Sequence, residues 1–388
     1  MGSGGGGGGL LGRGGEREEG VGEGGEGGAG LRGDRPITEA IGFHGCKTWD
    51  LPKTLASYIV PSHPTFKYSY VASSNGLIWI NVFVTPYDHT CNIYKSFVGN
   101  PVLRQWVIIP PPPNTLVESH STLNPFTAMV TGVDEDGIVS SFKLVRTCQR
   151  TCTSVIEPKE SGIYVWRVYV YSSETGFWTC KRLLSSRPVD YFGSYSPVNL
   201  NGLLYLRERG YGSSKPGVLI AYDFYVPESD DQCLVIPLPG KDNIDAKRCL
   251  TTSGGDVIYI ELLYRKLKIW RLLNSESESW QLLRKFHIFS FGRVDNCFPL
   301  AMNPFDTDII YLWSQDYGYL LSGNLQSEEF FLHGESEDWI GSECCFRINT
   351  AGSEEHMEDN RDKTAVLMLS QFVLSRWMDS VPRPPNPS

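Results

Sequence analysis

The sequence has no long hydrophobic run and no marker of export. No segment approaches the roughly 18 continuous apolar residues that a membrane-spanning helix requires, and the start of the chain lacks the apolar stretch of a cleavable signal peptide. An Asn-x-Ser/Thr acceptor for glycosylation, with any middle residue but proline, is also missing. We therefore expect an intracellular protein, in the cytoplasm, the nucleus or both, without a membrane partner.

The motifs of catalytic and metal sites are missing too. None of the seven histidines pairs with another His or a Cys at metal-ligand spacing. Neither a Gly-x-Ser-x-Gly elbow nor a Gly-Lys-Ser/Thr phosphate loop occurs. We expect no catalytic residue, no metal site and no cofactor, and hence no enzyme. A carboxylate pair for glycoside chemistry would be brought together only by the fold, so that alternative stays open as the least favoured one.

The ten cysteines do not have the spacing of a disulfide framework. No Cys-x-x-Cys pair occurs, and most cysteines stand singly in apolar runs, among them Cys180, Cys233, Cys249 and Cys297. In a chain of 388 residues without a secretory signal, this placement favours reduced cysteines in the protein core.

Positive charge is in deficit. The chain has 35 Lys and Arg against 44 Asp and Glu, which gives a formal net charge of −9. A surface of this sign repels nucleic-acid backbones and anionic membranes, so we expect neither as a partner. The acidic run 353–362 is predicted to be a solvated loop or, alternatively, a docking strip for a basic partner.

Residues 1–40 and the rest of the chain differ in composition. The first segment is rich in Gly, with Glu and Arg supplying most of the remainder. Such a segment buries too little apolar surface to offset the entropy lost on ordering, so we predict that it is disordered.

After Trp49, short runs rich in β-branched and aromatic residues alternate with tight turns. Three examples are Gly76–Val84, Ile163–Tyr171 and Val257–Tyr264. The turns use pairs such as Asn75-Gly76 and Asn201-Gly202, which tolerate positive φ and suit tight hairpins. This pattern predicts an all-β domain.

The strand-like runs repeat in five units of about 40 to 60 residues, which is the period of a four-stranded propeller blade. Aromatic residues make up 12% of the chain and supply the wide side chains that fill the faces between blades. We predict a β-propeller of about six blades. The sixth is expected to combine residues 40–75 with the C-terminal region, since closure removes exposed strand edges.

Five segments, in order, resemble the blade motifs of plant F-box proteins with a kelch-like associated domain. One runs from Asn100 to Pro110 and resembles the family's N-P-x-x-x-x-W-x-x-L-P blade ending. The others are Ser73–Ile78, Val170–Trp178, Val198–Tyr205, and Lys268–Leu272 followed by Trp280. By this resemblance, structural roles are expected for the blade-motif residues Asn75, Gly76, Asn100, Pro101, Trp106, Trp178, Asn201, Gly202, Trp270 and Trp280.

The resemblance assigns residues 53–388 to the associated propeller, with kelch-like blades. Members of the family begin with an F-box, a helical segment that docks on the Skp adaptor of a cullin ubiquitin ligase. Here the Gly-rich residues 1–40 take that place. Residues 41–52 resemble only the end of an F-box, through Cys46, Lys47 and Trp49, which are the candidate adaptor contacts.

Two functions follow from the resemblance. The first is recognition of target proteins for a Skp–cullin–F-box ubiquitin ligase, which makes the target, the adaptor and the cullin the expected partners. The second is an orphan propeller that binds partners without ubiquitination, because the F-box pattern is missing. A propeller enzyme such as a glycosidase or a sugar oxidase is the third and least favoured reading.

Overall fold

The computed structural model describes the strands of the chain and the tight turns between them. The described residues are 66–84, 93–100, 103, 105–113, 127–147, 164–187, 197–208, 217–226, 232–240, 243, 246–274, 279–288, 297–314, 319–333 and 381–385. All of them belong to a compact unit that begins at Asp34. Within these ranges no helix has the length and apolar character needed to cross a membrane. The predicted disordered segment 1–40 and the F-box remnant 41–52 lie outside them.

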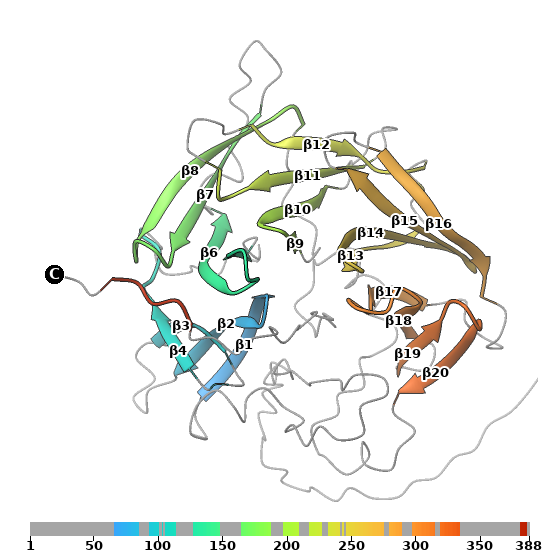
Figure 1. Cartoon of the computed structure of the whole chain (residues 1–388), viewed down its shortest axis with the longest axis horizontal. Helices are drawn as coiled ribbons and strands as arrows, with labels where there is room; N and C mark the ends of the chain where they lie inside the picture. The colour runs from blue at the N-terminus through green and yellow to red at the C-terminus, as the bar shows by residue number, and fades with distance from the viewer. Residues whose placement is uncertain are drawn as a thin grey trace, which may run out of the picture. The chain divides into compact units, whose positions relative to one another are not determined.

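The described strands form five antiparallel sheets of four strands each, which we call blades 1 to 5 (Figure 1). Blade 1 contains β1 (Phe66–Ser74), β2 (Leu77–Val84), β3 (Ile93–Asn100) and β4 (Gln105–Ile109). Blade 2 contains β5 (Thr127–Val133), β6 (Val139–Thr147), β7 (Tyr164–Ser172) and β8 (Trp178–Ser185). Blade 3 contains β9 (Val198–Leu200), β10 (Leu203–Glu208), β11 (Val218–Asp223) and β12 (Leu234–Pro237).

The last two blades follow the same order of strands. Blade 4 contains β13 (Lys247–Ser253), β14 (Asp256–Leu263), β15 (Lys266–Asn274) and β16 (Ser279–His287). Blade 5 contains β17 (Cys297–Met302), β18 (Ile309–Ser314), β19 (Tyr319–Asn324) and β20 (Glu329–His333). The first strand of each blade lies on the inner side and the fourth on the outer side (Figure 1). This order of consecutive hairpins, with inner strands such as β13 and β17 in contact, is that of a β-propeller.

The prediction of about six blades is wrong for the described residues, which form five. The error comes from the position of the first strand in each blade. The sequence units begin at turns such as Asn75-Gly76, whereas each blade begins one strand earlier. Residues Phe66–Ser74, which were assigned to a closing sixth blade, therefore form the inner strand β1 of blade 1 and pair with β2.

Alternate residues of a strand face opposite neighbours, because successive side chains point to opposite faces of a sheet. In β14, Val257 and Tyr259 pack in the hydrophobic cluster shared with blade 3. Ile258 and Ile260 pack in the cluster shared with blade 5. Similar clusters join blade 1 to blade 2 and blade 2 to blade 3. Burial on both faces accounts for the unbroken apolar runs in the sequence.

The inner hairpins turn as the Asn-Gly pairs predict. Asn75 and Gly76 have φ of 42° and 77°, and Asn201 and Gly202 have φ of 51° and 83°. Two successive residues with positive φ make the primed turn whose twist matches that of the strands. Asn tolerates this conformation and Gly adopts it without a steric penalty.

None of the four described cysteines, Cys180, Cys233, Cys249 and Cys297, forms a disulfide. Cys233 and Cys297 are buried and Cys249 is partly buried. Cys180 is exposed, which corrects the prediction of a core position for it. It lies on the outer strand β8, and an outer strand is less fully enclosed by its neighbours than an inner one.

Candidate protein-binding surface

The predicted motif residues of blade 1 shape the hairpin between its two outer strands. The side-chain oxygen of the buried Asn100 accepts a hydrogen bond from the backbone N–H of Leu103 at 3.2 Å. Trp106 pairs with Gly99 across the sheet, and a Cβ at Gly99 would lie only 2.3 Å from the indole ring. The motif therefore fits an aromatic ring over a glycine. Pro101 lies outside the described residues.

Two motif tryptophans join consecutive blades. The indole N–H of Trp178, at the start of β8, donates to the carbonyl of Pro110 at 2.7 Å. The indole N–H of Trp280, near the start of β16, donates to the carbonyl of Pro237 at 2.9 Å. In both cases the fourth strand of one blade begins where the fourth strand of the preceding blade ends. We call these two contacts the tryptophan latches.

The tryptophan latches also pack against tyrosines of their own blades. The ring centroids of Tyr171 and Trp178 are 5.5 Å apart, and those of Tyr259 and Trp280 are 5.9 Å apart. Trp270 is 8% exposed and lies in the cluster between blades 3 and 4. The motif tryptophans are thus spread over several blade contacts and do not converge on one site. The predicted adaptor contacts Cys46, Lys47 and Trp49 lie outside the described residues.

A row of four charged residues crosses blade 4 from its inner to its outer strand. In the strand register, Arg248 of β13 lies opposite Glu261 of β14, Glu261 opposite Lys268 of β15, and Lys268 opposite Lys285 of β16. Residues directly opposite each other in antiparallel strands share a face of the sheet. We call these four residues the charge row.

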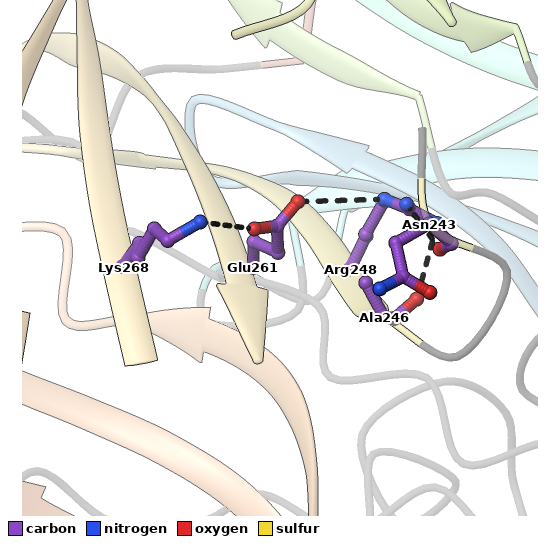
Figure 2. A network of polar contacts seen from close by, with 5 residues as sticks. All are labelled: Asn243, Ala246, Arg248, Glu261 and Lys268. Carbon is purple, nitrogen blue, oxygen red and sulfur yellow. Dashed lines mark hydrogen bonds and ion pairs between the residues drawn. The ribbon is translucent and has the colours of Figure 1, made fainter. Parts of the chain in front are cut away.

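The inner end of the charge row is buried and held by several contacts (Figure 2). The Glu261 carboxylate, with a side chain 5% exposed, lies 2.8 Å from the Lys268 ammonium and 4.0 Å from Arg248 Nε. The Arg248 guanidinium also donates to the backbone carbonyls of Asn243 and Ala246. These acceptors compensate the burial of the guanidinium, which would otherwise be costly.

The charge row faces blade 3. Tyr259 precedes Glu261 by two residues on β14, so both point to the same face, and Tyr259 packs in the cluster shared with blade 3. Burial raises the pKa of Tyr259 to about 12, although nearby Arg207 and Arg248 oppose the shift. The tyrosine is therefore neutral beside the charge row at physiological pH.

The outer end of the charge row is open to solvent. Strand β12 of blade 3 ends at Pro237, beside Trp280 near the start of β16. The next residues of β16, from Gln281 to Lys285, are all exposed. Further along, Lys266 lies opposite His287, and both are exposed. Lys266, Lys268, Lys285 and His287 form what we call the basic surface.

Exposed apolar side chains adjoin the basic surface. Leu282 and Leu283 of β16 are 47% and 37% exposed, and Tyr264 at the tip of the β14–β15 hairpin is 70% exposed. The register shifts by one residue between Ile269 and Trp270, which leaves an extra residue in β16. A bulge and neighbouring charges keep such an outer strand from pairing with other sheets. Exposed apolar side chains beside charges of one sign suit contact with a protein segment of the opposite charge.

The acidic turn between β5 and β6 of blade 2 is stabilised by one of its own carboxylates. The Asp134 carboxylate accepts hydrogen bonds from the backbone N–H groups of Asp136 and Ile138, at 3.0 and 2.8 Å. Among the described residues, no group of three or more His, Cys, Asp or Glu side chains has the arrangement of a metal site.

Sequence reasoning missed the charge row. Its four members stand far apart in the sequence, and only the strand register places them side by side. The single local signal is the excess of Lys and Arg around the Tyr264–Arg265 turn. From the sequence alone, such a turn indicates an ordinary solvated hairpin.

The comparisons with known proteins agree with this architecture. The family model described as F-box protein At3g26010-like, beta-propeller, matches residues 31–383. F-box protein At1g49990 of Arabidopsis thaliana is 55% identical over 373 residues, which cover 91% of this chain and 85% of that protein. F-box protein At3g26010 of the same plant is 40% identical over 356 residues, covering 90% and 77%.

A third Arabidopsis thaliana relative, the putative F-box/kelch-repeat protein At4g22430, is 39% identical over 361 residues and is covered to 79% of its length. The match of the family model extends over all five blades, and the three relatives agree with the resemblance seen in the motif residues. The chain belongs to the plant F-box protein family whose β-propeller domain is of the At3g26010 type.

Proposed function

We propose that this chain recognises target proteins for a Skp–cullin–F-box ubiquitin ligase in the cytoplasm or the nucleus. The observation that carries the proposal is the family match over residues 31–383, together with relatives that are themselves named F-box proteins. In this role the propeller binds the target, and the segment before it contacts the adaptor. The work of the chain is binding rather than catalysis.

The geometry of blade 4 supports a binding role. A rigid propeller holds the basic surface in place, because the strands beneath it pack on both faces in hydrophobic clusters. Binding residues on such a scaffold lose little conformational entropy when a partner docks. Nearby exposed leucines supply apolar contact area beside the charges.

Affinity purification tests the ligase part of the proposal. The chain with an N-terminal tag is expressed in plant cells, and the co-purified Skp-type adaptor and cullin are quantified by mass spectrometry. We expect the adaptor in near-stoichiometric amount. We also expect its loss in a Lys47→Glu/Trp49→Ala variant, while a variant at an exposed residue of blade 2, Arg182→Glu, retains it.

The same purification separates the orphan propeller from the ligase subunit. If other proteins co-purify while the adaptor is absent from the unmodified chain, ubiquitin-ligase membership is refuted and binding without ubiquitination takes its place. If the adaptor is present in both the unmodified chain and the Lys47→Glu/Trp49→Ala variant, residues 41–52 are not its contact.

A further inference from the structure

We propose that the basic surface of blade 4 binds an acidic segment of a partner protein. This inference rests on the proposed role as a target-binding subunit and specifies the chemistry of the target. The bound segment is expected to present several Asp or Glu side chains, or phosphorylated residues, to Lys266, Lys268 and Lys285.

The charge row is unbalanced. It contains three cations, Arg248, Lys268 and Lys285, and one carboxylate, Glu261, so its formal charge is +2 (three minus one). Glu261 already pairs with Lys268 and lies near Arg248. Among the residues that the structure describes, no acidic side chain forms an ion pair with Lys285 or Lys266. Within the described part of the chain, the positive charge at the outer end of the row is therefore not balanced by a carboxylate.

Lys268 and Lys285 lie directly opposite each other on one face of the sheet. Like charges in this relationship repel and destabilise a sheet. An anion seated beside both ammonium groups would convert the repulsion into two attractive contacts. Because Lys268 is only 29% exposed at its side chain, part of that attraction would act in a low-dielectric setting.

The neighbouring apolar residues point to a peptide rather than a free ion. Leu282 lies opposite Trp270, so it shares the face of Lys268 and is 47% exposed beside the basic surface. A free anion gains nothing from a leucine, whereas a peptide buries it. Tyr264, 70% exposed at the nearby hairpin tip, offers a further contact of the same kind.

The net charge of the whole chain favours an acidic peptide over nucleic acid as the ligand of the basic surface. A nucleic acid engages a protein through many phosphates, and the chain's net charge of −9 opposes such an extended polyanion. The basic surface is confined to the ends of the two outer strands of one blade, β15 and β16. A short acidic segment matches that extent.

Binding of a fluorescent oligoglutamate peptide to the full-length chain, followed by fluorescence anisotropy, tests the inference. We expect saturable binding that weakens as salt rises, since exposed charge contacts are screened. We expect no binding of an oligolysine peptide. A phosphoserine-containing peptide of equal charge, in a parallel titration, shows whether carboxylates or phosphates bind more tightly.

The decisive variant is Lys266→Glu/Lys285→Glu, which should bind oligoglutamate at least about tenfold more weakly. The milder Lys266→Gln/Lys285→Gln keeps the test valid if charge reversal disturbs folding, and its binding should also weaken. The matched control, Arg182→Glu at an exposed position of β8, should bind like the unmodified chain.

Three outcomes would overturn the inference. Equal binding by the unmodified chain and both lysine variants would remove the basic surface from the interaction. Tighter binding of a single-stranded DNA than of oligoglutamate, lost in the same variants, would assign the surface to nucleic acid. Tighter binding of oligoglutamate after Glu354→Gln, Glu355→Gln and Glu358→Gln would show that the chain's own acidic run is the occupant.

The titration uses purified chain without adaptor, so its result is independent of ligase membership. Peptide binding in a chain that does not co-purify with the adaptor would refute the proposed ligase role and leave the basic surface as a binding site. Adaptor binding without peptide binding would refute the basic surface as a binding site and leave the proposed ligase role standing.

Discussion

Trp280 of blade 4 donates its indole N–H to the carbonyl of Pro237, the last residue of strand β12 in blade 3, at 2.9 Å. The corresponding contact between Trp178 and Pro110 joins blades 2 and 1 at 2.7 Å. A proline at the end of β12, and one directly after β4, therefore present an acceptor for the next blade. In both contacts the acceptor belongs to an Ile-Pro pair, and the donor is a motif tryptophan of the following blade.

Replacing Trp280 with Phe should destabilise the protein modestly. The ring stays, but the donor to Pro237 is lost, and a hydrogen bond of this kind contributes about 0.5–1.5 kcal/mol to the free energy of unfolding. The midpoint of urea unfolding measures the change. Trp178→Phe should give a similar shift, since it removes the equivalent donor. A midpoint unchanged in both variants would mean that the latches contribute nothing to stability.

Replacing Glu261 with Gln should destabilise the protein more strongly. The variant leaves the buried Arg248 without its carboxylate and removes the partner of Lys268. Breaking a buried ion pair from one side costs about 3–5 kcal/mol. Lys268→Met is the matched control, and it should cost less because Glu261 keeps Arg248 nearby. Unfolding in guanidinium chloride measures both variants, and a larger loss for Lys268→Met would contradict this account.

Alkaline pH should weaken the fold through Tyr259. Burial raises the pKa of Tyr259 to about 12 from its ordinary value of 10.0, so the folded state holds the phenol proton more tightly than the unfolded chain. This contribution to stability is fully present below pH 10 and is lost as pH rises through about 12. Tyr259→Phe should flatten the fall of the unfolding free energy over that window.

Tyrosine absorbance checks the same pKa directly. The phenolate signal of the unmodified chain should contain a late component near pH 12 from Tyr259 and Tyr225, since burial raises the pKa of both to about 12. In Tyr259→Phe the late component should shrink without a change in the earlier ones. A late component of equal size in Tyr259→Phe would show that other tyrosines titrate near pH 12 and that Tyr259 does not.

Replacing Gly99 with Ala should disturb the outer hairpin of blade 1. An added Cβ would lie 2.3 Å from the Trp106 ring and 2.4 Å from the carbonyl oxygen of Gln105. Because the carbonyl belongs to the backbone, the strands must move, and overpacking of this kind costs about 1–3 kcal/mol. Thermal unfolding measures it. Full rescue by Trp106→Ala would show that the ring alone sets the cost.

The C-terminal segment 381–385 contributes to the contact between blades 1 and 2. Val381 is 2% exposed within their shared cluster, and its backbone N–H donates to the side-chain carbonyl of Gln105 at 3.2 Å. Val381→Asp should therefore lower the unfolding midpoint sharply, because it buries a charge without a partner. The nearby exposed Arg383→Asp should leave it nearly unchanged. Equal effects of both variants would contradict the packing role of Val381.

The strand pattern of the blades could be predicted from the sequence, since runs such as Val218–Tyr222 are apolar on both faces and the Asn-Gly turns are explicit. The inner strands could be predicted less accurately from the sequence. β9 has only three residues, and β13 reads KRCLTTS, which is too polar to stand out as a strand. Missing those strands moved the blade boundaries by one strand and led to the prediction of a sixth blade.

The charge row lay beyond sequence reasoning for a different reason. Arg248 and Lys285 reach one face only through three successive pairings, each fixed by a turn length and, in β16, by a register shift. No local sequence pattern shows that these three pairings bring the four residues onto one face. The motif tryptophans, by contrast, carry a local signal, but it marks contacts between blades rather than a surface for a partner.

Strand β12 is four residues long, whereas β16 has nine. In the binding role that we propose for blade 4, this difference would make strand length a means of tuning recognition. A relative whose third blade continued past Pro237 would shield Lys285 while retaining every lysine of the surface. Specificity within such a family could then change by insertion or deletion at one rim strand, without a single substitution among the residues that touch the ligand.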